Sequence, residues 1–240
     1  MKEQVAYSVN LVENVKLTNE RIASALTRSR SDQLVKIIAV TKTHPAVTIV
    51  DVYKAGLFNI GENRIQEAEK KFSELPSLQG LQKRMIGHLQ SNKVNKAIEL
   101  FDKIDSVDSI KLANKISNAA LAINKKSDVL LEVNTSGEKT KFGFNPEDIE
   151  ELLTCIELPG LKVQGLMTIG PLTQDTQQVR KAFVQLRELF DLLNNQRSKN
   201  MDLLTELSMG MSGDFELAIE EGSTMVRLGT VLFGPRKPYP

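Results

Sequence analysis

Eight short apolar runs, most of them followed by a helical pattern or a helical turn, dominate the chain from residue 35 onward. Apolar runs of this length indicate strands that are buried on both faces. The runs are VKIIAV (35–40), LFNIG (57–61), RMIG (84–87), KIDSV (103–107), DVLLEV (128–133), LKVQGLMTIG (161–170), LLTELSMG (203–210) and TMVRLG (224–229). Alternating β and α segments are typical of a parallel sheet. Eight of them predict a TIM (β/α)8 barrel of the α/β class, with a doubly wound open sheet as the alternative.

Helical patterns precede and separate these runs. Residues 2–29 form a long amphipathic pattern, and PAVTIVDVYKAG (45–56) has Pro45 near its start and Gly56 at its C′ position. The predicted apolar face of the first helix consists of Val5, Val9, Val12, Val15, Ile22 and Leu26. No linker or composition shift divides the chain. We therefore expect one domain over residues 1–240, with an N-terminal helix (1–30) followed by the barrel (31–240).

Composition narrows the classes of function. The chain has 31 Lys and Arg against 30 Asp and Glu, so it lacks the basic field of a nucleic-acid-binding protein. The single cysteine, Cys155, excludes an intramolecular disulfide and fits a reducing compartment. The N-terminus MKEQVAYSVN has no apolar signal region, and no apolar run approaches the ~18 residues of a membrane span. We expect a soluble, cytoplasmic protein with no nucleic-acid or membrane partner.

The first predicted strand leads directly to a candidate reactive residue. Lys42 follows the apolar run IIAV and lies between Thr41 and Thr43, where a barrel collects its functional residues. Partial desolvation favours the amine of a lysine over its ammonium form, and the amine is a nucleophile toward carbonyls. Lys42 is therefore a candidate for Schiff-base formation. The alternative is a solvated loop lysine.

The segments after the last two predicted strands are rich in glycine and hydroxyl side chains. SMGMSGD (208–214) and RLGT (227–230) allow backbone N–H groups to approach an anion, and their hydroxyls add donors. The loops after strands seven and eight are the usual phosphate site of this barrel. A carbonyl-reactive lysine that faces a phosphate site is the arrangement expected of a pyridoxal 5′-phosphate site, although aldolases contain the same two features.

The chain resembles the pyridoxal phosphate homeostasis protein family, whose members look like the barrel half of alanine racemase. The resemblance covers nearly the whole chain. It is carried by AVTKTHP, FNIGENRIQEAEKK, IGHLQSNK, GLMTI, ELSMGMSGDFELAIEEGSTMVRLGT and FGPR. It implies a barrel that binds pyridoxal phosphate.

The resemblance also implies roles for individual residues. Lys42 matches the lysine that holds the cofactor as an internal aldimine, Arg227 the arginine that faces the pyridine nitrogen, and Asn63 the asparagine of the GEN motif. The phosphate-binding segment is matched by Ser208, Ser212, Gly229 and Thr230. One departure stands out: Lys83, Arg84 and Met85 replace the family's usual Trp-His-Phe, which removes the usual histidine and is expected to alter the rim beside the cofactor.

The function implied is intracellular homeostasis of pyridoxal phosphate, by buffering or by delivery to apoenzymes that depend on it. We expect a monomeric or weakly associating protein that is not an efficient enzyme. An arginine at position 227 cannot accept the proton that would make the ring a strong electron sink. The alternative is an amino acid racemase, which needs a second acid or base. The three tyrosines, Tyr7, Tyr53 and Tyr239, do not lie at predicted strand ends, and the expected chain has no second domain.

The remaining chemically active residues have ordinary interpretations. Two histidines, His44 and His88, and one cysteine offer no metal constellation, and both histidines are expected to be structural. Cys155 is predicted to belong to a helix core or surface. The charge run EAEKK (67–71) is interpreted as a solvated helix face. Lys139 and Lys141 are interpreted as loop lysines near the mouth of the barrel, with a weaker second aldehyde site as the alternative.

Overall fold

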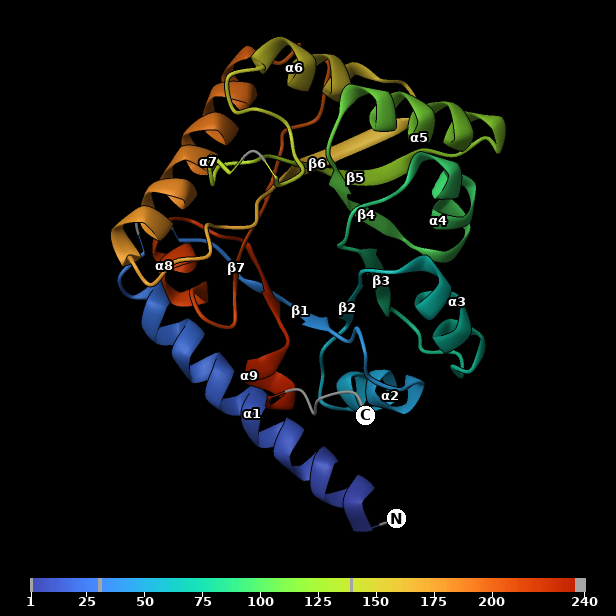
Figure 1. The fold of residues 1–240 in the computed structure, drawn as a ribbon, viewed down its shortest axis with the longest axis vertical. Helices are drawn as coiled ribbons and strands as arrows, with labels where there is room; N and C mark the ends of the chain where they lie inside the picture. The colour runs from blue at the N-terminus through green and yellow to red at the C-terminus, as the bar shows by residue number, and fades with distance from the viewer. Residues whose placement is uncertain (1, 30–31, 139, 236–240) are drawn as a thin grey trace.

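The computed structural model describes residues 2–29, 32–138 and 140–235, and side chains from Asn10 onward. Eight parallel strands pair in sequence order and close into a barrel (Figure 1). The strands are β1 (Lys36–Val40), β2 (Asn59–Glu62), β3 (Gln82–Met85), β4 (Lys103–Val107), β5 (Ser127–Glu132), β6 (Leu161–Met167), β7 (Glu206–Met211) and β8 (Met225–Leu228). The predicted TIM barrel is confirmed, and the open sheet is excluded because β1 pairs with both β2 and β8.

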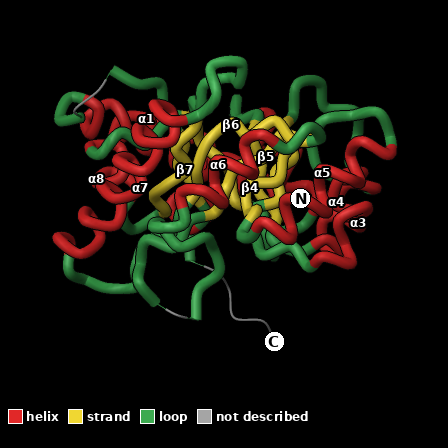
Figure 2. Tube along the Cα trace, turned by 90° about the horizontal axis from the view of Figure 1, so that it is seen from above, coloured by secondary structure: helices red, strands yellow, loops and turns green. Residues whose placement is uncertain are grey.

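Helices surround the barrel, and the strands form its centre (Figures 1 and 2). They are α1 (Lys2–Leu26), α2 (Ala46–Lys54), α3 (Ile65–Ser73), the 3₁₀ turn η1 (Ser91–Lys93), α4 (Val94–Leu100), α5 (Ile110–Ala122), α6 (Ile149–Glu157), α7 (Thr176–Gln196), α8 (Phe215–Glu220) and α9 (Thr230–Phe233). Pro45 is the N-cap of α2, and Gly56 follows the C-cap with φ of 83°, as expected for a C′ glycine.

Helix α1 lies across α8 and α9, beside the barrel rather than within it (Figure 1). Arg21 forms a two-bond ion pair with Glu216 (2.8 and 2.9 Å), and Asn14 donates to the Leu232 carbonyl. The predicted apolar face of α1 is partly wrong, because Val12 is 58% exposed. The buried stripe consists of Leu11, Val15, Thr18, Ile22 and Ala25. The predicted Val5 and Val9 lie outside the described side chains.

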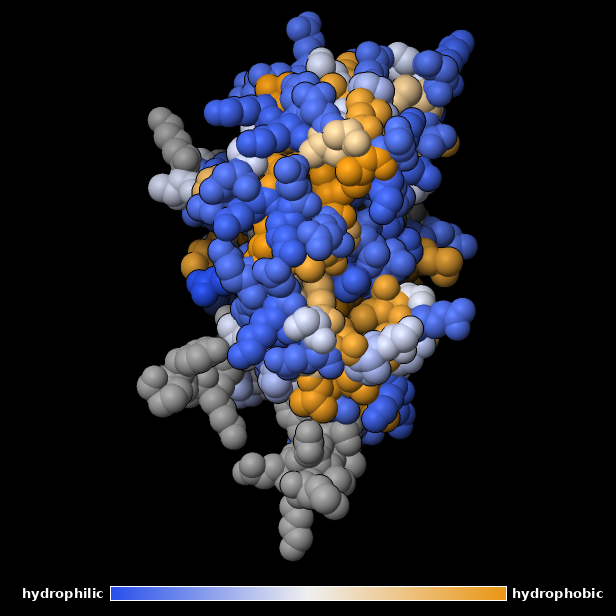
Figure 3. Space-filling view, turned by 90° about the vertical axis from the view of Figure 1, so that its right-hand side faces the viewer, coloured by the Kyte–Doolittle hydropathy of each residue, from blue (hydrophilic) through white to orange (hydrophobic). Residues whose placement is uncertain are grey.

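Most of the apolar core lies between the outer faces of the strands and the helices. Val129 and Leu131 of β5 and the following Val133 pack into this layer, so the alternating residues point into the barrel. The same alternation directs Ile37 and Ala39 of β1 outward. On the side of the molecule that carries α3 to α5, hydrophilic side chains surround a narrower apolar band (Figure 3). Among the described residues, none of the helices has the length and hydropathy required of a membrane span.

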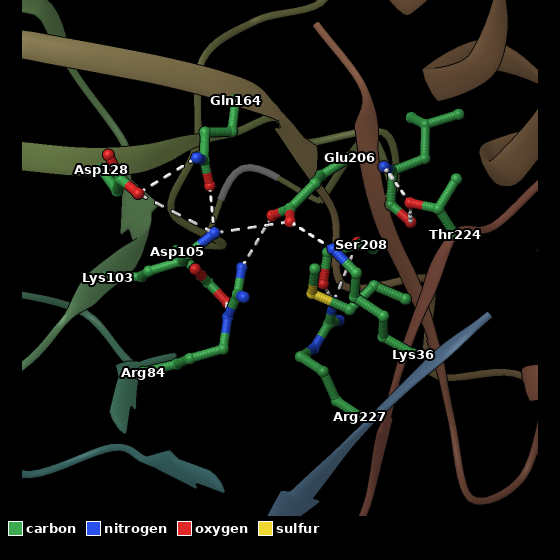
Figure 4. Close-up of polar contacts among 12 residues, drawn as sticks. Lys36, Arg84, Lys103, Asp105, Asp128, Gln164, Glu206, Ser208, Thr224 and Arg227 are labelled. Atoms are coloured by element: carbon green, nitrogen blue, oxygen red, sulfur yellow. Dashed lines mark hydrogen bonds and ion pairs between the residues drawn. The ribbon is translucent and has the colours of Figure 1, made fainter. Parts of the chain in front are cut away.

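Part of the barrel interior contains charged side chains, where this fold usually has branched apolar ones. Glu206, the first residue of β7, lies between Lys36 on one side and Arg84 and Lys103 on the other (Figure 4). Arg84 also donates to Asp105 at 2.7 Å and is only 1% exposed. Burial opposes the ionisation of Glu206, but these cations outweigh it and lower its pKa to about 2. A buried charge is tolerated here because each one has a partner.

The structure shows where the three departing residues, Lys83, Arg84 and Met85, lie. Lys83 places its ammonium over the Phe72 ring at 5.2 Å, and Met85 packs in the outer core. Arg84 points into the barrel, where it contacts Asp105 of β4 and Glu206 of β7. Of the three residues, Arg84 is the one whose side chain is buried among charged partners.

Candidate functional site

Lys42 lies two residues after the carboxyl end of β1. Ile37 and Ala39 pack outward, so Lys36, Ile38 and Val40 form the inward row that leads toward Lys42. The residue is half-buried. The following residue, Thr43, has φ of 68°, a left-handed conformation that is unusual for a β-branched side chain. The loop that carries Lys42 is thus sharply turned where the strand ends.

A group of hydrogen-bond donors follows β7 and β8. The Ser212 hydroxyl oxygen accepts from the backbone N–H of Gly229 and of Val231, each at 3.3 Å. Ser212 and Gly229 are half-buried, while Thr230, the first residue of α9, is exposed at the rim. Three of the four predicted phosphate residues therefore lie together, and Val231 joins them. Its contribution is a backbone N–H, which no side-chain motif identifies.

Ser208 is the predicted phosphate residue that the structure separates from this group. It is fully buried in the barrel, and its hydroxyl accepts from Arg227 at 2.7 Å. Arg227 also donates to the Ser208 carbonyl at 2.9 Å (Figure 4). A further bond to the Thr168 carbonyl at 2.7 Å joins Arg227 to the residue that follows β6, so its guanidinium is held from two sides. Ser208 therefore positions Arg227 in this structure. The interior direction of both side chains follows from their alternation with outward Leu207 and Val226.

Arg227 is a buried cation on β8, one residue before the carboxyl end of that strand. Burial lowers the pKa of its guanidinium, and three carboxylates oppose that shift: Asp105, Glu132 and Asp214. Arginine keeps its charge even with a lowered pKa. A guanidinium with its N–H groups directed at carbonyls has no lone pair to offer a ligand, so it can only donate.

Asn63 follows β2, the neighbour of β1, and is half-buried. Its backbone approaches Gly87 so closely that a Cβ on Gly87 would lie 2.7 Å from the Asn63 Cβ. The glycine of IGHLQSNK thus allows the loops after β2 and β3 to pack together. This contact holds Asn63 at the same end of the barrel as Lys42.

The structure also contains a cluster of polar side chains next to the backbone of Lys42. We call it the Glu62 cluster, and it consists of Thr41, Glu62, Glu67 and Lys71. Lys71 is 7% exposed, so the interpretation of EAEKK as a solvated face is wrong at this residue. Its ammonium bonds to Glu62 (2.8 Å) and Glu67 (2.6 Å). The four-residue spacing of Glu67 and Lys71 was visible in the sequence, but the burial comes from packing α3 against β2.

Glu132 is a second residue that the sequence did not identify as functional. It ends β5, points inward between outward Leu131 and Val133, and is 6% exposed. Burial raises the pKa of its carboxyl to about 7, and the Arg227 charge only partly opposes this effect. The signal was an acidic residue inside the apolar run VLLEV.

The other candidate residues have structural roles or lie at the rim. His44 packs on Phe233 with ring centroids 4.6 Å apart, whereas His88 bonds to Asp108 at 2.8 Å and stacks on Phe142. Cys155 is buried in the core, as predicted, and burial raises its pKa to about 12. Lys141 bonds to Glu138 and to the Gly170 carbonyl, and Lys139 lies outside the described residues. Within the described residues, no cluster of three or more His, Cys, Asp or Glu side chains could hold a metal ion.

The barrel and this arrangement at its mouth define a class of protein. Residues 19–237 match the family described as alanine racemase, N-terminal domain. An alanine racemase from Clostridium difficile superposes with a TM-score of 0.74 at 19% identity, covering 95% of this chain and 61% of that one. At that identity the likeness demonstrates the fold alone.

Closer relatives specify the family. The chain is 46% identical over 231 residues to the pyridoxal phosphate homeostasis protein of Aquifex aeolicus, covering 95% of this chain and all of that protein. The structure of PipY from Synechococcus elongatus with PLP bound is 41% identical, with a TM-score of 0.78 over 90% of this chain and 99% of that one. The chain belongs to the pyridoxal phosphate homeostasis protein family, as the sequence motifs predicted.

Proposed function

We propose that this protein binds pyridoxal 5′-phosphate as a Schiff base on Lys42 and takes part in the homeostasis of that cofactor, by buffering it or delivering it. The observation that supports the proposal is that Gly229, which donates to Ser212, packs against the end of β1, where β8 closes the barrel. A Cβ on Gly229 would lie 3.7 Å from the Val40 Cβ, two residues before Lys42. The bound form of the relative PipY supports the choice of ligand.

The residues present fit the phosphate of this cofactor. Two backbone N–H groups, of Gly229 and Val231, converge on one oxygen, the Ser212 hydroxyl. Convergent backbone donors with a hydroxyl beside them are the arrangement that binds anions. Thr230 adds an exposed hydroxyl at the same rim. We assign these four residues to phosphate binding.

Lys42 supplies the covalent link. Its side-chain amine would hold the cofactor through the aldehyde group. We assign Arg227 to the pyridine nitrogen, Ser208 to holding Arg227, and Asn63 to the edge of the site beside Lys42. When bound, the cofactor supplies a reactive aldehyde and an electron-withdrawing ring.

Efficient turnover is not part of the proposal. Arg227 cannot take a proton from the ring nitrogen, which leaves the ring a weak electron sink. The racemase alternative needs a second acid or base, and Tyr53 donates its hydroxyl to the Gln79 carbonyl outside the barrel mouth. Tyr7 and Tyr239 lie outside the described side chains. We further propose that the chain acts as one cofactor-binding barrel domain, a cytoplasmic monomer that passes the cofactor to apoenzymes.

Borohydride reduction tests the proposal. Purified protein incubated with pyridoxal phosphate is reduced, digested and analysed by mass spectrometry, and the pyridoxyl adduct is expected on Lys42. Lys42→Ala should lose the adduct, whereas the rim variant Lys141→Ala should keep it. An equal yield of adduct in Lys42→Ala would refute the assignment.

A further inference from the structure

The residue before Lys42 is held at both its side chain and its carbonyl by the Glu62 cluster. The Oε1 atom of Glu62 accepts from the Thr41 hydroxyl at 2.7 Å and from the Lys71 ammonium at 2.8 Å. The same ammonium donates to the Thr41 carbonyl oxygen at 2.8 Å. Glu62 itself is fully buried at the end of β2. Thr41 therefore has little freedom to rotate.

The residue after Lys42 is held by the other carboxylate of the cluster. Glu67 accepts from the Thr43 backbone N–H at 2.5 Å and from Lys71 at 2.6 Å. Thr43 has φ of 68°, which a β-branched residue adopts only when its surroundings impose it. Burial opposes the ionisation of Glu67, but its bonds to Lys71 and Thr43 outweigh burial and lower its pKa. Both peptide groups that flank Lys42 are thus fixed by one connected group.

Fold stability alone does not account for this cluster. Burying charged groups costs free energy, and apolar residues of similar volume often replace a buried ion pair without loss. The second carboxylate oxygen of Glu62 is buried without a hydrogen-bond partner among the described residues. The Glu62 cluster thus costs free energy, and its hydrogen bonds reach the peptide groups on both sides of Lys42. This combination points to a role in orienting Lys42.

We propose that Glu62 is a positioning residue for Lys42, acting through Thr41, Lys71 and Glu67 to fix the backbone from which the reactive amine extends. The inference rests on the proposed function, since it assumes that Lys42 bonds to the aldehyde. It assigns Glu62 no contact with the cofactor. Its loss should therefore weaken the covalent step and leave recognition of the phosphate unchanged.

Two ligands separate these effects. Pyridoxal phosphate reports covalent binding, followed by absorbance and borohydride trapping. Pyridoxine 5′-phosphate has the same ring and phosphate but no aldehyde, and its affinity is measured by calorimetry. The double variant Glu62→Gln with Lys71→Met removes both charges of the pair together, so that neither remains buried alone. It is expected to weaken pyridoxal phosphate binding about tenfold or more, because a small misplacement of a reactive group costs a large factor in rate and equilibrium. Pyridoxine phosphate binding should stay within about twofold.

A milder pair of variants covers the case in which the double variant does not fold. Thr41→Val keeps the shape of the side chain and removes its hydroxyl, whereas Thr41→Ser keeps the hydroxyl. We expect Thr41→Val to reduce adduct formation at Lys42 and Thr41→Ser to restore most of it. The matched control is Glu69→Gln with Lys96→Met, a surface ion pair of 2.8 Å that joins α3 to α4 and should affect neither ligand.

The outcomes distinguish the positioning role of Glu62 from the proposed binding of the cofactor on Lys42. Loss of affinity for pyridoxal phosphate alone supports positioning by Glu62. An equal loss for both ligands, or no loss for either in the double variant and in Thr41→Val, overturns it. If the unaltered protein forms no reducible adduct on Lys42, the proposed function itself fails, and the positioning role fails with it.

Discussion

Replacing Glu132 by glutamine should make the cofactor-free protein more stable above neutral pH. Glu132 is 6% exposed and lies inside the barrel near Arg227. Its pKa rises from 4.5 to about 7 because burial disfavours the charged form. Glutamine has nearly the same shape and carries no charge, so it imitates the protonated acid at every pH.

The pKa shift sets the size and the direction of the effect. Between pH 4.5 and about 7, the folded state binds the Glu132 proton more tightly than the unfolded state does, so the free energy of unfolding falls as pH rises. A difference between 4.5 and about 7 corresponds to about 3 kcal/mol at pH values above both. The wild-type protein should therefore lose about that much stability relative to Glu132→Gln across this range, and the difference should be constant at higher pH.

Urea denaturation at intervals from pH 4.5 to 9, followed by circular dichroism, measures this difference. Subtracting the two proteins cancels the titration of the other carboxylates, which both share. Glu138→Gln is the control: Glu138 lies in an exposed loop, and its bond to Lys141 lowers its pKa, so this variant should show a small change of opposite sign. A pH-independent difference between wild type and Glu132→Gln would mean that Glu132 is ionised throughout and that the desolvation argument is wrong.

Two further predictions concern the barrel wall and the phosphate group. Gly165→Ala should destabilise the fold by roughly 3 kcal/mol or more, because its Cβ would lie 1.7 Å from the Glu206 carbonyl oxygen of the next strand. Gly213→Ala, with open space around it, should stay within about 0.5 kcal/mol, as urea denaturation can show. Thr230→Glu should release pyridoxal phosphate at unchanged fold stability, because it places a carboxylate beside the donors that we assign to the phosphate. Titration of the cofactor-free protein with pyridoxal, which lacks the phosphate, should show a much smaller effect of this variant.

The strands and the barrel could be predicted from the sequence because their signal is local. A run such as KIDSV is apolar in its own neighbourhood, and the structure places β4 at those same residues, 103–107. Pro45 and Gly56 likewise mark the ends of α2 through their own backbone preferences. Family motifs added the candidate site, since they lie where the strands end.

The side-chain partners could not be predicted, because they come from distant parts of the chain. Arg84 is buried with Asp105 and Glu206, and the sequence near residue 84 does not indicate that a carboxylate from β7 will be its partner. The charged residues around Lys71 in the sequence suggest a solvated side chain, yet Lys71 is buried in an ion pair with Glu62. Ser208 belongs to a phosphate-like motif, but its strand directs it to Arg227. In each case tertiary packing overrides the local pattern.

The site we propose depends on closure of the barrel. Lys42 follows the first strand, and the group of Ser212, Gly229 and Val231 follows the last two strands, so the proposed site is assembled where β8 pairs with β1. The register places Ile38 opposite Arg227, and Val40 then lies against Gly229. An open or partly folded chain would retain each loop but would separate the amine from the anion donors. A ligand that bridges both halves binds the closed state alone and stabilises it by mass action. The proposed site therefore links cofactor binding to closure of the barrel through β1 and β8.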